Sequence, residues 1–239
     1  ECLVGSEMCI RDSSYSIRFN FESAGNLLYV LSKMSNLKKN DQDEYTILNI
    51  PYAQYIKGDL DFAKNIVIDN RNSIAFHIGG GIAIPYGNAR MIPFEKRYFS
   101  GGANSVRGWS VRSLGPGTFS DEKGNFMNQS GDIKLDASIE YRTRLFWKFR
   151  GALFVDAGNI WTIREYQDQP GGKFKFDQFY KQIAVAYGVG LRLDLDFFVL
   201  RFDGGMKAIN PEKGKDRYPI LRSDFGRDFA FHFAVGYPF

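Results

Sequence analysis

Two histidines, two cysteines and a run of three glycines are the groups in this sequence whose types suggest chemistry. A hydrolytic site needs a nucleophile or a set of carboxylates close to a histidine, and neither His77 nor His232 stands in a recognisable motif of that kind. Cys2 and Cys9 lack histidine partners for a zinc site. The glycines at 79–81 lack the Lys-Ser/Thr that completes a phosphate-binding loop. We therefore expect a protein that is not an enzyme and that uses neither a metal nor a cofactor.

An arginine in the longest polar connection, residues 85–131, is a further candidate. So long a link without secondary structure inside a compact β protein is normally functional. It contains the tetrapeptide Val106, Arg107, Gly108 and Trp109. A guanidinium fork can hold two carboxylates, Gly108 lets the backbone turn where a Cβ would clash, and Trp109 offers an apolar anchor. Taken alone, an arginine–glycine pair is more simply a solvated loop arginine.

The elements that must position this loop are long strands. From residue 132 to residue 146 the sequence alternates strictly, with one apolar face and one largely charged face that includes Glu140. This alternation runs well beyond the ~5–6 residues of a typical soluble strand. A strand of this length with one apolar face indicates a membrane or a very large sandwich.

The same alternation predicts eight strands, at residues 16–29, 52–68, 73–84, 132–146, 150–161, 183–196, 198–203 and 229–239. Large apolar side chains share one face, and small or charged side chains share the other. This is the pattern of an antiparallel transmembrane β-barrel, with apolar residues toward lipid and polar residues toward the lumen. Asp156, His77 and His232 fall on the inward face, so lumen-lining polar residues are the simplest interpretation of both histidines.

Connections and composition agree with a barrel. Short turns alternate with long polar links, as in outer-membrane barrels. Aromatic residues make up 16% of the chain and glycine occurs 25 times, a mixture that suits strands and tight turns. No apolar run approaches the roughly 18 residues of a transmembrane helix. A net charge of +4, evenly spread, argues against a nucleic-acid partner.

The loop and the two strands after it resemble a known family. The segment IPFEKRYFSGGANSVRGW, followed by LGPG, is similar to the bacterial surface antigen family of outer-membrane assembly barrels. That family includes the central subunit of the β-barrel assembly machinery and the translocation-and-assembly-module barrels. ASIEYR and FVDAGNIW match its motifs on the first and second strands after the loop. The resemblance implies that the loop enters the lumen and that Arg107 pairs with Glu140 and Asp156. The alternation independently assigns both acidic residues to the inward face.

The end of the chain, FAFHFAVGYPF, resembles the C-terminal signal of outer-membrane barrels. The residues that would carry this signal are Phe229, Phe231, Phe233, Tyr237 and Phe239. An exposed aromatic strand edge is what an assembly machine can pair with. A plain terminal strand is the simpler interpretation, and both can hold.

The resemblance covers roughly residues 15–239 and implies the C-terminal eight strands of a sixteen-strand barrel, with residues 85–131 as a lid loop inside it. Closure of the eight strands alone would leave too little room for that loop. We expect residues 14–239 to form this half-barrel. We expect residues 1–13 to be a non-native leader, because VGSEMCIRD resembles translated adapter sequence.

The implied function is assembly of other proteins in the bacterial outer membrane. Members of such a family accept unfolded outer-membrane proteins and pass them into the bilayer through a seam between the first and last strands. Periplasmic or lipoprotein partners are expected. The alternatives are a two-partner secretion pore or a passive channel, and an outer-membrane barrel enzyme is disfavoured because neither histidine has a motif.

Overall fold

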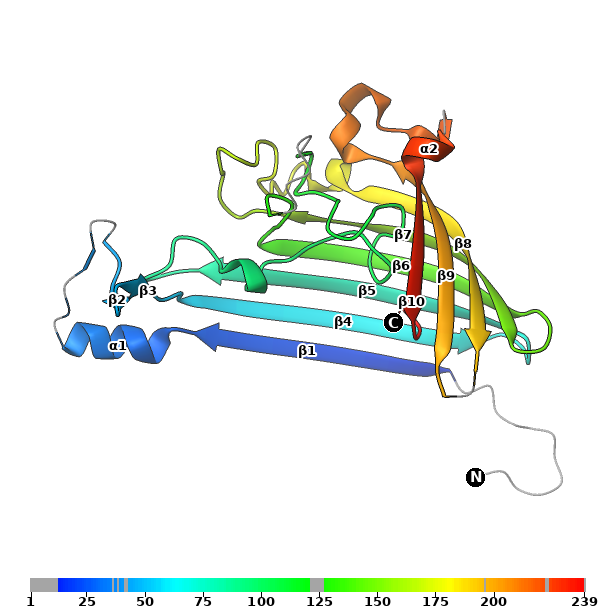
Figure 1. Cartoon of the computed structure of the whole chain (residues 1–239), viewed down its shortest axis with the longest axis horizontal. Helices are drawn as coiled ribbons and strands as arrows, with labels where there is room; N and C mark the ends of the chain where they lie inside the picture. Colours follow the sequence, from blue (N-terminus) through cyan, green and yellow to red (C-terminus); the bar gives the residue numbers. More distant parts are fainter. Residues whose placement is uncertain are drawn as a thin grey trace, which may run out of the picture.

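Eight long strands form one antiparallel sheet in the computed structural model of the chain (Figure 1). The structure describes residues 13–35, 37, 39–40, 43–120, 127–195, 197–221 and 224–238. The strands lie in the order β1-β4-β5-β6-β7-β8-β9-β10. Their bounds are β1 Ser14–Ala24, β4 Tyr55–Val67, β5 Asn72–Pro85, β6 Ile133–Arg144, β7 Phe149–Trp161, β8 Ala184–Asp194, β9 Val199–Ile209 and β10 Phe229–Val235. The predicted all-β fold with eight antiparallel strands is confirmed.

The sheet has one apolar face and one polar face. On the outward face large apolar side chains are exposed, for example Phe19 at 70%, Leu153 at 57% and Phe231 at 62%. The registers place such residues side by side, so that Phe19 lies opposite Leu60 of the next strand. On the other face charged side chains such as Glu140 are buried. This is the inverse of a soluble β protein and matches a surface that faces lipid.

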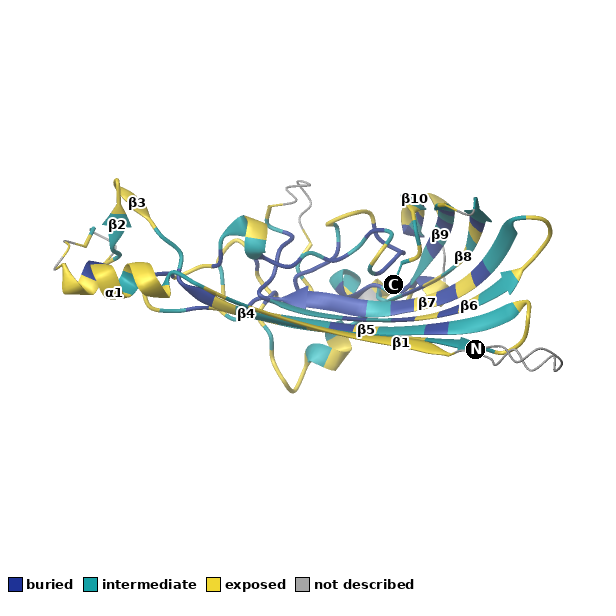
Figure 2. Ribbon diagram, turned by 90° about the horizontal axis from the view of Figure 1, so that it is seen from below, coloured by how far each residue is buried: buried dark blue, intermediate teal, exposed yellow. Residues whose placement is uncertain are grey.

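The sheet is curved, and the long connection between β5 and β6 lies on its concave side (Figure 2). Because neighbouring strands run antiparallel, alternate connections emerge at the same end of the sheet. Three short turns, β4 to β5, β6 to β7 and β8 to β9, therefore share one end, and the long connections share the other. Short helical segments occur in the long connections: η1 Phe94–Lys96, η2 Phe179–Gln182, η3 Pro211–Asp216, η4 Pro219–Leu221 and α2 Phe225–Asp228. Among the described residues, none of the helices is long and apolar enough to cross a bilayer.

The first predicted strand is too long at its end. Instead of continuing to residue 29, β1 stops at Ala24, and helix α1, Asn26–Met34, follows. Gly25 between them has φ of 80°, which favours glycine, and a Cβ there would lie 2.3 Å from the carbonyl oxygen of Ala53. The apolar residues that follow have helical spacing, which a short test for alternation does not separate from a strand.

Other boundaries also differ from the prediction. β9 continues to Ile209, beyond the predicted end at residue 203, and β10 ends at Val235. Gly236 has φ of 88° and turns the chain away from β10 after that residue. The small hairpin of β2, Thr46–Ile47, and β3, Ile50–Pro51, lies in a connection that the sequence indicated to be a polar link.

Candidate functional site

The part of the lid loop around Arg107 folds on itself before it meets the sheet. The backbone N–H of Gly102 donates to the carbonyl of Trp109 at 2.9 Å, and the N–H of Trp109 donates to the carbonyl of Val106 at 3.2 Å. Gly101 has φ of 93°, and a Cβ there would lie 2.4 Å from the carbonyl oxygen of Ser110. These bonds hold the segment in a tight turn that brings Arg107 to the polar face of the sheet.

Arg107 is held by two acidic residues on neighbouring strands. Its Nε and Nη2 donate to the two carboxylate oxygens of Asp156 on β7, at 2.7 and 2.8 Å. Its Nη1 donates to Oε2 of Glu140 on β6 at 2.6 Å. Ser138 donates to Asp156 at 2.6 Å and accepts from Arg107 at 3.2 Å. Arg107, Glu140 and Asp156 are all buried, so these are charge-assisted bonds shielded from water.

Further arginines surround the same carboxylates. Arg192 on β8 donates to Oε2 of Glu140 at 2.9 Å and lies 2.9 Å from Asp203 on β9. Arg142 donates to the other oxygen of Glu140 at 2.7 Å. Arg201 lies 3.2 Å from Asp203 and donates to two acceptors in the loop, the carbonyl of Ala103 and the side chain of Asn104. We call this set the arginine cluster: Arg107, Arg142, Arg192, Arg201, Glu140, Asp156 and Asp203.

Burial and ion pairing act in opposite directions on Arg107. Burial alone lowers the pKa of a guanidinium, but the hydrogen bonds and charges of Asp156 and Glu140 outweigh it and raise the pKa of Arg107 above its ordinary value. The arginine therefore stays charged. A buried pair of this kind fixes position strongly, because removing one partner leaves the other charge unpaired.

The backbone at Arg107 also contacts the sheet. Its N–H donates to Asp156 at 3.0 Å, and its carbonyl oxygen accepts from Nε2 of His232 on β10 at 3.0 Å. Gly205 on β9 lies directly below, since a Cβ there would be 2.2 Å from that same oxygen. The aromatic ring of Phe154 stacks under the guanidinium, 3.5 Å from its carbon to the ring centroid. The loop can approach this closely because position 205 has no side chain.

Trp109 secures the next part of the loop. It is buried in an apolar cluster with Val106 and Leu114 of the loop and with Ala184 and Ala186 of β8. Gly108 lies against the same strand, where a Cβ would be 2.7 Å from that of Ala186. The tetrapeptide 106–109 therefore contacts the sheet through each of its residues.

Comparison with known proteins assigns the chain to a family. A model of the Omp85 superfamily domain matches residues 15–239. The chain belongs to the Omp85 superfamily. The assembly-barrel resemblance carried by the loop and strand motifs is thereby confirmed, and the predicted location in the bacterial outer membrane is confirmed with it.

Relatives of this Omp85 chain include proteins of bacteria and of animals. It is 30% identical over 183 residues to the outer membrane protein assembly factor BamA of Neisseria meningitidis serogroup B, covering 68% of this chain and 21% of that protein. It is 28% identical over 204 residues to the sorting and assembly machinery component 50 homolog A of Xenopus laevis, covering 77% of this chain and 42% of that protein. The chain thus spans less than half the length of these relatives.

A solved structure has the same fold. The crystal structure of BamA from Haemophilus ducreyi lacking POTRA domains 1-3 superposes with a TM-score of 0.54 at 19% sequence identity, covering 94% of this chain and 51% of that one. The likeness extends over nearly the whole sheet. The eight strands therefore have the fold of part of that structure.

A second anchor of the lid loop lies near β4 and was not found from the sequence. The hydroxyl of Tyr98 donates to Asp59 at 2.5 Å, and the amine of Lys57 lies 4.2 Å from the centre of the Tyr98 ring. Lys96 forms an ion pair with Glu22 of β1 at 2.6 Å. The only sequence signal for this anchor is that Glu22 and Asp59 lie opposite the apolar residues in the alternation of their strands. The loop therefore reaches the first strands of the sheet as well as the last.

The two histidines singled out from the sequence lie on the polar face of the sheet. His77 lies between Asp61 at 3.3 Å and Asp136 at 3.4 Å on the polar face, and His232 contacts the carbonyl of Arg107. No group of three or more histidine, cysteine or acidic residues is arranged to hold a metal ion among the described residues. Cys2 and Cys9 lie outside those residues.

The aromatic residues proposed as the C-terminal signal divide into two groups. Phe229, Phe231 and Phe233 alternate along β10, and the last two are exposed on the outward face. Tyr237 follows the turn at Gly236, and its ring lies 4.7 Å from the guanidinium of Arg142. Phe239 lies outside the described residues.

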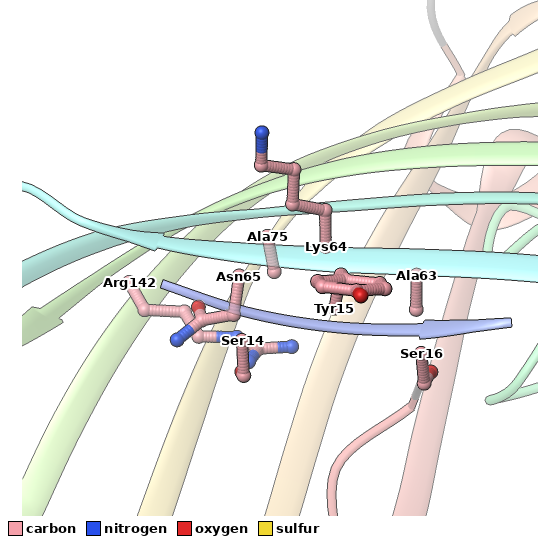
Figure 3. Close-up of a pocket in the computed structure, with 8 residues that line it drawn as sticks. All are labelled: Ser14, Tyr15, Ser16, Ala63, Lys64, Asn65, Ala75 and Arg142. Atoms are coloured by element: carbon pink, nitrogen blue, oxygen red, sulfur yellow. The ribbon is translucent and has the colours of Figure 1, made fainter. Parts of the chain in front are cut away.

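A pocket of about 200 Å³ adjoins the arginine cluster at the start of β1 (Figure 3). The small side chains of Ala63 and Ala75 leave space there, and Arg142 reaches in from β6. Figure 3 shows Lys64 pointing away from Arg142 and Asn65. Arg142, which lines this pocket, also contacts Glu140 and Tyr237.

Proposed function

We propose that this chain is the C-terminal half of a sixteen-strand barrel in a factor that assembles proteins in the bacterial outer membrane. Membership of the Omp85 superfamily supports this proposal, as does the similarity to BamA, an outer membrane protein assembly factor. In this proposal residues 14–239 are the half-barrel, residues 85–131 are a lid loop in its lumen, and the protein is not an enzyme.

The observation that carries the proposal is the attachment of Arg107 to Asp156 and Glu140. A barrel that passes substrates through its wall must keep its own long loop out of the hydrocarbon and in a defined place. A buried, bidentate arginine pair does this with high geometric specificity. The carbonyl of the same residue bonds His232 of β10, so the loop is also held against the C-terminal edge of the sheet.

The substrates would be unfolded outer-membrane proteins that add a strand at this edge. β10 pairs with β9 on one side only within the described sheet, and an edge strand offers a row of backbone donors and acceptors. Phe231 and Phe233 present aromatic side chains to the lipid beside it. The other side of the seam would be the first strand of the whole barrel, and periplasmic or lipoprotein partners would deliver substrates.

The terminal aromatic residues would serve as the signal by which this chain is itself inserted. Deleting Phe239 from the natural protein should reduce the amount that reaches the outer membrane. Deleting Gly236 to Phe239 should reduce it further, whereas unchanged membrane levels in both variants would contradict a signal at this end.

The test is reconstitution of the natural protein that carries this chain into liposomes supplied with a urea-denatured outer-membrane barrel protein. Folding of that substrate is read by its heat-modifiable migration on gels and by resistance to protease. We expect Arg107→Ala to slow folding severalfold. Arg90→Ala changes an exposed arginine of the same loop and should behave as the unmodified protein.

Two results would overturn the proposal. If liposomes that contain the unmodified protein accelerate folding of the substrate no more than empty liposomes do, an assembly function is excluded. If they instead show steady ion conductance and release of enclosed solutes without folding of the substrate, the protein is a secretion pore or a channel.

A further inference from the structure

Helix α1 presents its apolar side to the outside of the protein. All five of its aliphatic and methionine side chains are exposed: Leu27, Leu28, Val30, Leu31 and Met34. Leu27 is 72% exposed and Met34 is 75% exposed. At 3.6 residues per turn, the spacing of these residues places them on one side of the helix. Leaving them in water would be unfavourable, because burial of each such side chain is stabilising.

The polar side of α1 is the side that contacts the protein. Ser32 is buried and its hydroxyl oxygen lies 3.2 Å from the donating hydroxyl of Tyr52. The side-chain oxygen of Asn26 accepts from Gln54 at 3.0 Å and from the hydroxyl of Tyr86 at 2.5 Å. A helix on a soluble domain faces its apolar stripe to the core. In α1 the polar side faces the protein and the apolar side faces outward, as the apolar face of the sheet also does.

The position of α1 continues the apolar outward face of β1. That face consists of Tyr15, Ile17, Phe19 and Phe21, all exposed, and the helix follows the strand in line at its end (Figures 1 and 2). A strand needs about 9–11 residues to cross the hydrocarbon of a bilayer, and β1 has 11. The last outward position of β1 is Ser23, and the exposed side chains of Ile56 and Ile84 lie beside it on the next two strands. Helix α1 therefore begins at the margin of the apolar outward face.

We propose that α1 is an interfacial anchor whose apolar side lies at the boundary between headgroups and acyl chains of the outer-membrane bilayer. Its occupant is lipid, because the exposed side is apolar, is continuous with the lipid-facing side of β1 and lies at the level of the interface. Lys33 is exposed on the other side of the helix and can remain in the aqueous headgroup layer. This inference depends on the membrane location of the chain and is independent of the assembly function.

Spin labelling of the natural protein in liposomes tests the anchor. With the other cysteines replaced by serine, single cysteines replace Leu31 on the apolar side of α1, Lys33 on its polar side and Phe19 on the outward face of β1. Each position carries a nitroxide, and its collision rates with oxygen, which concentrates in lipid, and with a water-soluble nickel chelate are measured.

We expect the label at position 31 to resemble the lipid reference at position 19, with a high ratio of oxygen to nickel collisions. The label at position 33 should show the reverse ratio. Equal nickel collisions at 31 and 33 would overturn the proposal, because both sides would then lie in water. Low collision rates with both reagents at 31 would also overturn it, because protein would then cover the apolar side.

Discussion

Asp156 holds Arg107 by three hydrogen bonds, two from the guanidinium and one from the backbone N–H. Because this bond needs only the peptide N–H of residue 107 as its donor, we expect it to persist after any substitution at position 107 other than proline. The side-chain bonds need a planar fork, which lysine lacks. Loss of one partner of a buried ion pair costs about 3–5 kcal/mol. We therefore expect Arg107→Ala to lower the melting temperature of the purified protein in detergent, and Arg107→Lys to restore little of the loss. Full rescue by lysine would show that charge alone is sufficient.

Glu140 should be more important than Asp156 for the arginine cluster. It contacts Arg107, Arg142 and Arg192, so Glu140→Gln leaves three guanidinium groups short of a negative charge. Asp156→Asn affects one arginine. Melting temperatures of the two variants should rank Glu140→Gln well below Asp156→Asn. An equal or opposite ranking would mean that Asp203 balances the cluster by itself.

Gly205→Ala should displace the lid loop although it adds only a methyl group. The added Cβ would lie 2.2 Å from the carbonyl oxygen of Arg107 and 2.7 Å from its carbonyl carbon, which forces backbone atoms apart. We expect faster cleavage of the loop by protease in the folded protein. Gly58→Ala is the matched control, since nothing lies within 4 Å of a Cβ at that position. Equal protease sensitivity of both variants would contradict the close approach of loop and strand.

The bond between His232 and the loop should stabilise the C-terminal strand. A carbonyl oxygen can only accept, so Nε2 of His232 must donate to it. His232→Leu removes that donor and leaves the carbonyl unpaired, at a cost of about 1–3 kcal/mol. Amide hydrogen exchange along β10 should become faster in His232→Leu, and the amide donor in His232→Gln should recover part of the protection. Unchanged exchange in His232→Leu would exclude this role.

Tyr98→Phe should loosen the first half of the lid loop while leaving the arginine cluster in place. The variant removes the hydroxyl that donates to Asp59. Burial and the hydrogen bond to Asp59 raise the pKa of Tyr98 above its ordinary value. A raised pKa keeps this contribution intact below the ordinary value near 10, so the difference in melting temperature between variant and parent should be the same at pH 6 and pH 9. If the difference in melting temperature disappears by pH 9, the contribution of the Tyr98 hydroxyl to stability is not the one described.

The strands were predictable because their alternation is long and strict. Glu140 and Asp156 fall on the inward face by phase alone, and the structure brings both to Arg107. What alternation cannot supply is the register between strands and the height at which the loop meets them. Gly205 illustrates this limit, since nothing local to it indicates that a loop nearly a hundred residues earlier in the chain would approach its Cα.

There are also physical reasons why part of the arginine cluster and helix α1 were not predicted. Arg192, Arg201 and Asp203 fall on the inward face by the same alternation, but inward residues are numerous and only long-range pairing selects those that surround Glu140. Helix α1 was interpreted as the end of a strand because apolar residues are frequent in both. The signal that would have distinguished it is the spacing of its apolar residues, which fits one side of a helix and not a strict alternation.

The attachments of the lid loop have a mechanical consequence for the whole wall. The loop is tied to Glu22 at one margin of the sheet and to His232 at the other, with further contacts on the strands between them. We expect these contacts to restrict changes in the curvature of the eight strands. Widening the sheet between its inner strands would break these loop contacts as well as the hydrogen bonds between strands. We therefore expect any change in the circumference of the wall to occur at the outer edges of β1 and β10.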